Sequence, residues 1–122
     1  MSSPYPKVYN YLDDDGSSIH LTQPFSVIVN LGNLVYEITV PKGFHSDLAS
    51  VPKIARRFVP VHGKYSPSAI VHDYLIENKL FSRKTADDIF NEMNKKLGVK
   101  RWRRKIMYMA VRAHGSLKKN RY

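Results

Sequence analysis

The chain has 122 residues, enough for one domain with its own core and too few for two. It contains no cysteine, which excludes disulfide scaffolds, thiolate zinc sites and cysteine nucleophiles. Its formal net charge of +10 lies entirely in residues 61–122, because residues 1–60 carry five basic and five acidic side chains. This asymmetry predicts an anionic partner, either nucleic acid or a phospholipid surface; solubility or contact with an acidic neighbour is the alternative.

No targeting or membrane-spanning segment is visible in the sequence. Its start has neither the basic residues nor the apolar run of a signal peptide, and no stretch approaches the roughly 20 apolar residues of a membrane span. We therefore expect no membrane span, and synthesis in the cytoplasm. We also expect a single α+β domain over residues 1–122, with a β-rich part at 1–40, a motif loop at 41–65, a three-helix part at 66–116 and a basic tail at 117–122.

The first forty residues are predicted to form antiparallel strands. Two segments rich in β-branched and aromatic residues, 25–29 and 34–40, flank Leu31-Gly32-Asn33, which is typical of a hairpin turn. A further strand is expected at 8–12, followed by an acidic turn at 13–16. The N-terminal part should therefore be an antiparallel hairpin or meander.

Three helices are predicted after the motif loop. The first spans about 66–78 and opens with an N-cap serine and a proline. The second begins after the N-cap Ser82 and ends at Gly98. The third runs from about 100 to 114, with Gly115 beyond its end. Its buried face is predicted to be the apolar stripe at helical spacing, namely Trp102, Ile106, Met109, Ala110 and Ala113.

Two ionisable residues, His72 and Asp73, lie within the otherwise apolar segment 69–76 of the first helix. Burying a carboxylate or an imidazole without a partner is costly, so such groups are usually paired, metal-bound or functional. The short link at 79–81 makes the first two helices antiparallel neighbours, which brings Asp87 level with His72. Asp87 would then orient His72 as a general base and leave Asp73 to bind a cation or cap another group. A buried hydrogen bond with no catalytic role is the alternative.

The motif loop at 41–65 has no clear period and contains several prolines and glycines. Its apolar content favours an ordered loop, with room for a helical turn near residues 54–57. Within it, Asp47 and Ser50 have the spacing of a turn capped by an aspartate side chain. A serine nucleophile is not predicted, because Ser50 lacks the Gly-x-Ser-x-Gly elbow and precedes Val51-Pro52.

A functional interpretation of the same loop places Asp47, together with His45, against Asp73 and His72 around a metal ion or a bound water. Oxygen-rich ligands would suit calcium or magnesium, and an added histidine would suit zinc or manganese. No spacing in the sequence matches a defined metal motif. A divalent cation is therefore one expectation for this loop, and a side-chain-capped turn is the other.

The third helix begins in a strongly basic segment with a single indole at Trp102. Trp102 is in phase with Ile106 and Met109, so it is predicted to lie in the core. Several cations and Tyr108 share the opposite face, which could follow the phosphates of a nucleic acid with salt-dependent affinity. The candidate anion-binding residues are Lys100, Arg101, Arg104, Lys105 and Arg112.

Three motifs together resemble a known family. They are Gly43-Phe44-x-x-Asp47-Leu48-Ala49-Ser50-Val51-Pro52, Ala69-x-x-His72-Asp73-Tyr74-Leu75 and Ser82-Arg83-x-x-Ala86-Asp87-x-x-Phe90. The resemblance, over roughly residues 40–115, is to a family met mainly in bacteriophages and prophages and catalogued as domain of unknown function 1353. It implies a phage-type origin and no particular activity. The recurring polar positions that it implies are Asp47, Ser50, His72, Asp73, Arg83 and Asp87.

A partial resemblance concerns the catalytic pair of secreted and parvoviral phospholipases A2. In those enzymes a histidine activates water, the adjacent aspartate binds calcium, and an aspartate on an antiparallel helix orients the histidine. His72, Asp73 and Asp87 match these roles by position. Two features depart from that pattern, because Ile76 occupies the position of a tyrosine and no glycine-rich calcium loop precedes the helix.

Two hypotheses follow. The leading one is a phage-encoded accessory protein, virion- or lysis-associated, made in the host cytoplasm and acting on a virion or host-envelope component. Its His72–Asp87 site would activate water for ester or amide hydrolysis, with or without a divalent metal. The rival is a non-enzymatic module, in which the polar set locks the loop to the helices and the basic helix docks onto nucleic acid or an acidic virion partner. A cleft reaching His72 would favour the enzyme, and an enclosed, fully paired His72 would favour the module.

Overall fold

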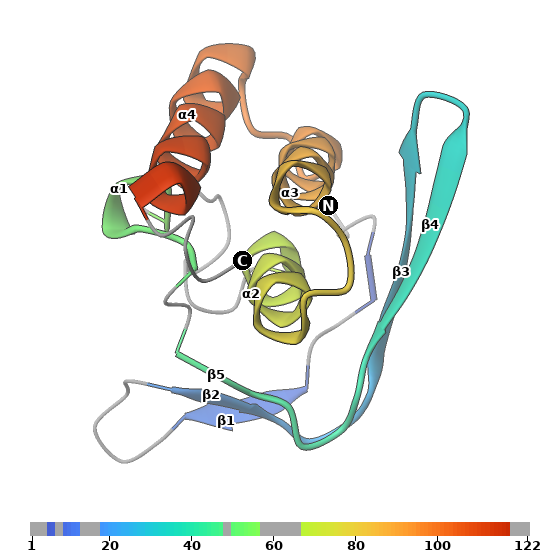
Figure 1. The fold of residues 1–122 in the computed structure, drawn as a ribbon. Helices are drawn as coiled ribbons and strands as arrows, with labels where there is room; N and C mark the ends of the chain where they lie inside the picture. Colours follow the sequence, from blue (N-terminus) through green and yellow to red (C-terminus); the bar gives the residue numbers. More distant parts are fainter. Residues whose placement is uncertain (1–4, 7–8, 13–17, 48–49, 57–66, 118–122) are drawn as a thin grey trace.

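The structure is a computed structural model that describes residues 5–6, 9–12, 18–47, 50–56 and 67–117. Within these residues, strands in two small antiparallel sheets precede four helices, which confirms the predicted α+β class (Figure 1). Three predicted features lie outside them: the acidic turn at 13–16, the end of the motif loop with the N-cap at residue 66, and the tail from residue 118.

One long, bent hairpin makes up most of the sheet structure. Its inner strands pair Phe25 with Val40, and its outer strands pair Ile19 with Ser46, so a single antiparallel register runs through both sheets. A further strand adds to the outer pair at its free edge. The strands are β1 (Asn10–Leu12), β2 (Ile19–Leu21), β3 (Phe25–Leu31), β4 (Leu34–Val40) and β5 (His45–Ser46).

A glycine forms the turn of the hairpin, and two prolines lie where it bends. Gly32 has a φ of 58°, which suits the two-residue turn between β3 and β4, and the predicted hairpin is confirmed. Pro24 and Pro41 interrupt the ladder between the inner and outer strand pairs, because proline has no N–H to donate. The backbone N–H of Gly43 still donates to Leu21 O at 2.9 Å across the bend. The bend turns β5 toward the helices (Figure 1).

Four helices complete the fold: α1 (Lys53–Arg56), α2 (Pro67–Asn78), α3 (Arg83–Lys96) and α4 (Arg101–Leu117). The second of these is enclosed on several sides, as its apolar sequence predicts, with all of residues 67–73 buried. It lies above the β1–β2–β5 sheet, while α3 lies beside the β3–β4 hairpin (Figure 1). The predicted N-cap of α3 is present, since Ser82 Oγ accepts a hydrogen bond from Thr85 N at 3.1 Å.

Two predictions for α4 are wrong. The helix continues to Leu117, so Gly115 lies inside it and is buried rather than beyond its end. Its buried face carries Met107 and Val111, whereas Trp102 and Met109 of the predicted core stripe are 55% and 60% exposed. The sequence offers two apolar stripes on this helix, and polar contacts with α3 select the one that turns inward.

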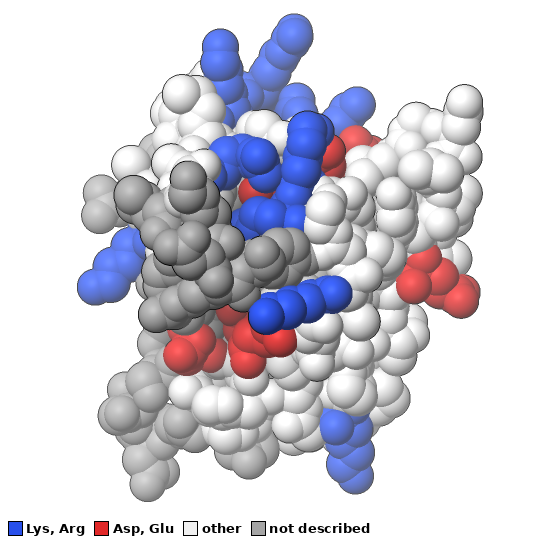
Figure 2. Space-filling view, viewed as in Figure 1, with Lys and Arg blue, Asp and Glu red and all other residues white. Residues whose placement is uncertain are grey.

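Basic side chains gather at the end of the molecule where α4 begins (Figure 2). The exposed lysines and arginines of this region come from the end of α3, the link that follows and the first turns of α4. Among the described residues, no helix combines the length and the apolar character that crossing a membrane requires.

Candidate functional site

The predicted contact between α2 and α3 lies at the centre of the protein. His72 Nε2 is 2.6 Å from Asp87 Oδ1, and both side chains are fully buried. Burial lowers the pKa of His72 below its ordinary value of 6.5, against the opposing effect of the Asp87 carboxylate. The neutral ring carries its proton on Nε2, because an ionised carboxylate can only accept a hydrogen bond. Nδ1 is therefore left as an acceptor.

Ser50 contacts His72 Nδ1, the acceptor nitrogen of the ring. Its Oγ lies 3.0 Å from His72 Nδ1, so the hydroxyl donates to the ring. The resulting chain, Asp87–His72–Ser50, has the order of groups that activates a serine nucleophile in hydrolases. Ser50 is 6% exposed and is the member of the chain nearest solvent. The sequence does not predict this contact, because Ser50 lies in a loop and not on a strand-to-helix elbow.

Two arginines balance the charge of Asp87. Arg112 Nη1 donates to Asp87 Oδ2 at 3.1 Å, and Arg83 Nε lies 3.4 Å from Oδ1. Arg83 Nη2 also donates to the carbonyl oxygen of Val111 at 3.1 Å and lies 3.5 Å from that of Ser50. Arg83 therefore links the motif loop, α3 and α4, which is a supporting role at the site. Arg112, a candidate for anion binding, contacts a carboxylate of the protein itself.

Asp73 fastens the motif loop to α2. Its Oδ2 accepts a hydrogen bond from Ser46 Oγ at 2.5 Å, and its Oδ1 accepts one from the backbone N–H of Ser50 at 3.2 Å. The Ser50 amide therefore has an acceptor on α2, while the predicted capping of the amides of residues 48 and 49 by Asp47 lies outside the described residues. Ser46, which is not among the predicted site residues, is buried because alternation along β5 turns it inward.

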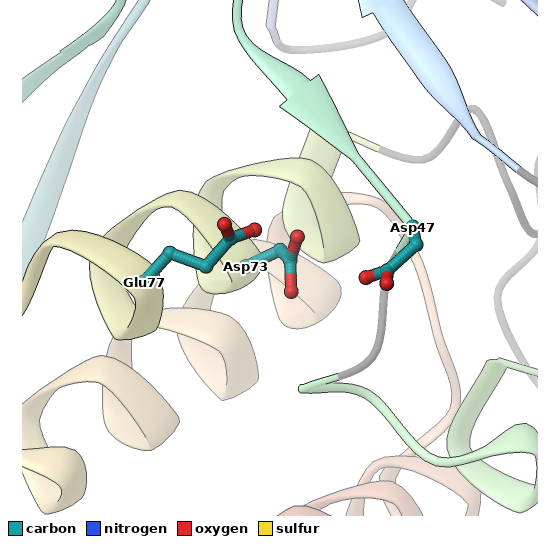
Figure 3. Close-up of side chains that lie close together, drawn as sticks. All are labelled: Asp47, Asp73 and Glu77. Atoms are coloured by element: carbon teal, nitrogen blue, oxygen red, sulfur yellow. The ribbon is translucent and has the colours of Figure 1, made fainter. Parts of the chain in front are cut away.

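Three carboxylates meet beside this anchor (Figure 3). Oxygens of Asp47, Asp73 and Glu77 all lie within 4.8 Å of one another. The convergence of Asp47 and Asp73 follows the functional interpretation of the loop, while Glu77 is an addition. A local signal could have found it, since Glu77 lies four residues after Asp73 and so on the same helix face.

The negative charges of these three carboxylates repel one another. Partial desolvation, a hydrogen bond with Asp73 and the negative charges of Asp73 and Asp47 raise the pKa of Glu77 to about 8. An all-oxygen set of this kind could hold calcium, magnesium or manganese, which prefer carboxylate ligands. Such a cation would take over from the proton held by Glu77 and balance the negative charge of the three carboxylates.

His45 does not join the cluster. It is exposed on β5, and its ring centroid lies 4.6 Å from that of His20. The alternation along β5 that turns Ser46 inward turns His45 outward, which is why the expected histidine contribution is wrong. Zinc, which favours nitrogen ligands, therefore has less support here than an oxygen-preferring cation.

The candidate anion-binding residues are divided between two environments. Lys100, Arg101 and Lys105 are exposed, whereas Arg104 Nε donates to Val99 O at 3.1 Å. Tyr108, predicted on the same phosphate-following face, donates its hydroxyl to Asp88 at 2.6 Å. The predicted basic face is therefore partly turned toward α3 and the neighbouring link, since Met107 and Val111 form the buried face of α4.

The fold and the site define a small α+β domain in which a loop and three helices meet at a buried polar centre. The chain belongs to the family described as protein of unknown function (DUF1353), whose model matches residues 19–111. No curated protein and no solved structure matches the chain.

Proposed function

We propose that the protein is a hydrolase of phage origin in which His72 is the general base and Asp87 orients it. The observation that carries the proposal is the Asp87–His72–Ser50 chain, with distances of 2.6 Å and 3.0 Å and a neutral ring whose acceptor nitrogen faces a hydroxyl. A base of this kind removes the proton of a hydroxyl or water that attacks an ester or amide carbonyl. The motif resemblance over residues 40–115 supports the phage origin and an accessory role in the virion or in lysis.

The proton transfers follow from the tautomer. As the nucleophile attacks a carbonyl carbon, its proton passes to His72 Nδ1, and the imidazolium formed is stabilised by Asp87. The same proton then passes to the leaving group as the tetrahedral intermediate collapses. The nucleophile is the Ser50 hydroxyl or a water molecule that takes its place at Nδ1. If Ser50 attacks, the acyl-enzyme that forms is then hydrolysed by water, with His72 again taking the proton of the water and returning a proton to Ser50 Oγ.

A second candidate function is that of a non-enzymatic phage adaptor, and it is favoured by an enclosed, paired His72, which is the feature predicted for this alternative. His72 is fully buried, both of its ring nitrogens are paired, and Asp87 is balanced by Arg83 and Arg112. Buried hydrogen-bonded networks of this kind rigidify a core. In this function the network fixes the motif loop against the helices, and the exposed basic residues contact nucleic acid or an acidic virion component.

Hydrolysis of chromogenic esters, acyl amides and phospholipid micelles tests the proposal, each in chelator and in calcium, magnesium or manganese. His72→Gln can still hydrogen-bond Asp87 and should fold, yet lose at least about 100-fold in rate. His45→Gln is the matched control, since His45 lies outside the chain. Substrate turnover that survives His72→Gln in the folded variant would refute the proposal, as would no turnover of any substrate by the wild type.

Ser50→Ala separates the two nucleophiles. If Ser50 attacks, this variant loses activity and the wild type is labelled at Ser50 by a fluorophosphonate. If water attacks, Ser50→Ala keeps or gains activity and no label appears. The adaptor function predicts a different pattern, in which no variant changes a turnover rate and His72→Gln only lowers the melting temperature.

A further inference from the structure

Helix α4 carries a second apolar stripe that faces solvent. Trp102 and Met109 are 55% and 60% exposed, and the half-buried Ile106 lies between them at helical spacing. The opposite face of the same helix already packs into the core through Met107 and Val111. The stripe spans two turns, so it is more than a single exposed side chain, and contiguous exposed apolar surface marks interaction sites.

Cations border this stripe on both sides. At 100° per residue, Arg101 and Lys105 lie on one side of the stripe and Arg103 on the other. All three are exposed, and the chain has no acidic residue after Glu92. The surface is extended by further exposed lysines in the region where Figure 2 shows basic side chains gathered, namely Lys95, Lys96 and Lys100.

We propose that this face of α4 docks onto an anionic phospholipid surface. Tryptophan and methionine enter the boundary between headgroups and acyl chains, while flanking lysines and arginines bind the anionic headgroups. The chemistry therefore matches the two parts of the surface, the stripe and its border. Hydrolysis at His72 is not required for this docking, so the inference is independent of the proposed function.

Nucleic acid fits the same face less well. Phosphates would contact the cations but would leave Ile106 and Met109 without an apolar partner. Stacking of an unpaired base on Trp102 is also restricted, because the guanidinium of Arg103 lies 5.3 Å from the centre of the indole. The exposed stripe is better matched by a surface that offers both negative charge and hydrocarbon.

The chain contains a single tryptophan, so Trp102 fluorescence reports directly on this face. Full-length protein is titrated with phosphatidylcholine vesicles, with and without phosphatidylglycerol, and sedimented with them. We expect a blue-shifted emission and co-sedimentation with the anionic vesicles, weakened by salt. Met109→Glu, and separately Arg101→Glu with Lys105→Glu, should each weaken binding at least about tenfold without changing the melting temperature.

The control for the double variant Arg101→Glu with Lys105→Glu makes the same change in net charge at two lysines outside α4. Lys42 and Lys79 are exposed outside α4, and Lys42→Glu with Lys79→Glu should leave vesicle binding within about twofold of the wild type. Equal loss in this control, or full binding by Met109→Glu, would mean that net charge alone adsorbs the protein and would overturn the inference. So would DNA that binds and quenches Trp102 while vesicles leave its emission unchanged.

Discussion

Arg83 passes so close to Gly115 that a β-carbon on Gly115 would lie 2.6 Å from Arg83 Nε. Real β-carbons essentially never make so short a contact. Gly115 lies inside α4, where a glycine normally lowers helix stability. Here the missing side chain leaves room for Arg83, which reaches the Val111 carbonyl of α4 and the Asp87 carboxylate of α3. This close approach explains why residue 115, buried inside the helix, is a glycine.

Gly115→Ala should therefore destabilise the protein. In a helix without such a neighbour, this change is worth about 1 kcal/mol of stabilisation. Here the new methyl group must displace Arg83, and we expect a net loss of about 1–2 kcal/mol in the free energy of unfolding, measured in urea.

A double-mutant cycle isolates the cause. Combined with Arg83→Ala, the Gly115→Ala change should regain its helix-stabilising sign, because the clashing side chain is gone. Ser116→Ala, at an exposed neighbouring position, serves as the control and should change stability by less than about 0.5 kcal/mol. Stabilisation by Gly115→Ala in the wild-type background would contradict the close approach.

Asp87→Asn should be strongly destabilising. The change removes the carboxylate that pairs with His72, Arg83 and Arg112, and it leaves two cations facing a buried neutral amide. Breaking a buried ion pair from one side costs about 3–5 kcal/mol, and partial exposure of Arg112 should bring the loss toward the lower end.

The adjacent carboxylate provides a matched comparison for that experiment. Asp88 accepts hydrogen bonds from Lys84 and Tyr108 but lies in a partly exposed position. Asp88→Asn should lower the free energy of unfolding by less than about 1 kcal/mol, as for other exposed pairs. Similar losses in the two variants, measured by urea denaturation, would show that burial of Asp87 does not set its contribution.

Below pH 6.5 the protein should lose stability through His72. Burial holds the pKa of this ring below 6.5 in the folded state, so the unfolded chain binds the extra proton first. The contribution is complete above pH 6.5 and declines as the pH falls toward the folded-state pKa. His72→Gln should flatten the melting-temperature profile between pH 7 and pH 5, whereas His45→Gln should keep the wild-type slope.

On the alkaline side, Glu77 should act in the opposite direction. Its pKa rises from 4.5 to about 8 on folding, so the folded state keeps a proton that the unfolded chain has lost. This stabilisation is complete below pH 4.5 and is lost as the pH rises through 8. Glu77→Gln should remove the decline in melting temperature between pH 6 and pH 9, and Glu37→Gln, on exposed β4, should not.

A divalent cation should stabilise the carboxylate cluster when Glu77 has lost its proton. If calcium, magnesium or manganese binds Asp47, Asp73 and Glu77, it should raise the wild-type melting temperature more at pH 9 than at pH 5.5. Asp47→Asn should remove that difference, because it takes away an exposed carboxylate without touching the Ser46 and Ser50 contacts of Asp73. An equal cation effect in Asp47→Asn would place the ion elsewhere.

Part of the fold and of the site could be predicted because it depends on short-range patterns. The β3–β4 hairpin follows from alternation and from the left-handed glycine of its turn, and the pairing of α2 with α3 follows from a cap, a link and a glycine stop. Once these two helices are antiparallel neighbours, the level of Asp87 against His72 is fixed by helical rise. The contact found there is the one predicted.

The loop contacts could not be predicted in the same way. Ser50 lies 22 residues before His72 in the chain, and no periodic pattern spans that separation. Its position depends on the bend at Pro24 and Pro41, which turns β5 toward α2. The predicted metal interpretation included His45 and missed Ser46, because the strand that separates their directions is only two residues long.

Local periodicity and capping thus encode the class of the fold, the two central helices and the buried pair His72–Asp87. The partner of His72 Nδ1 and the exposed face of α4 are not encoded locally. Both depend on contacts between distant segments. For α4 in particular, two apolar stripes were available. Tyr108 and Arg112 of α4 contact Asp88 and Asp87 of α3, Arg83 of α3 contacts the Val111 carbonyl of α4, and these contacts favoured the inward turn of Met107 and Val111.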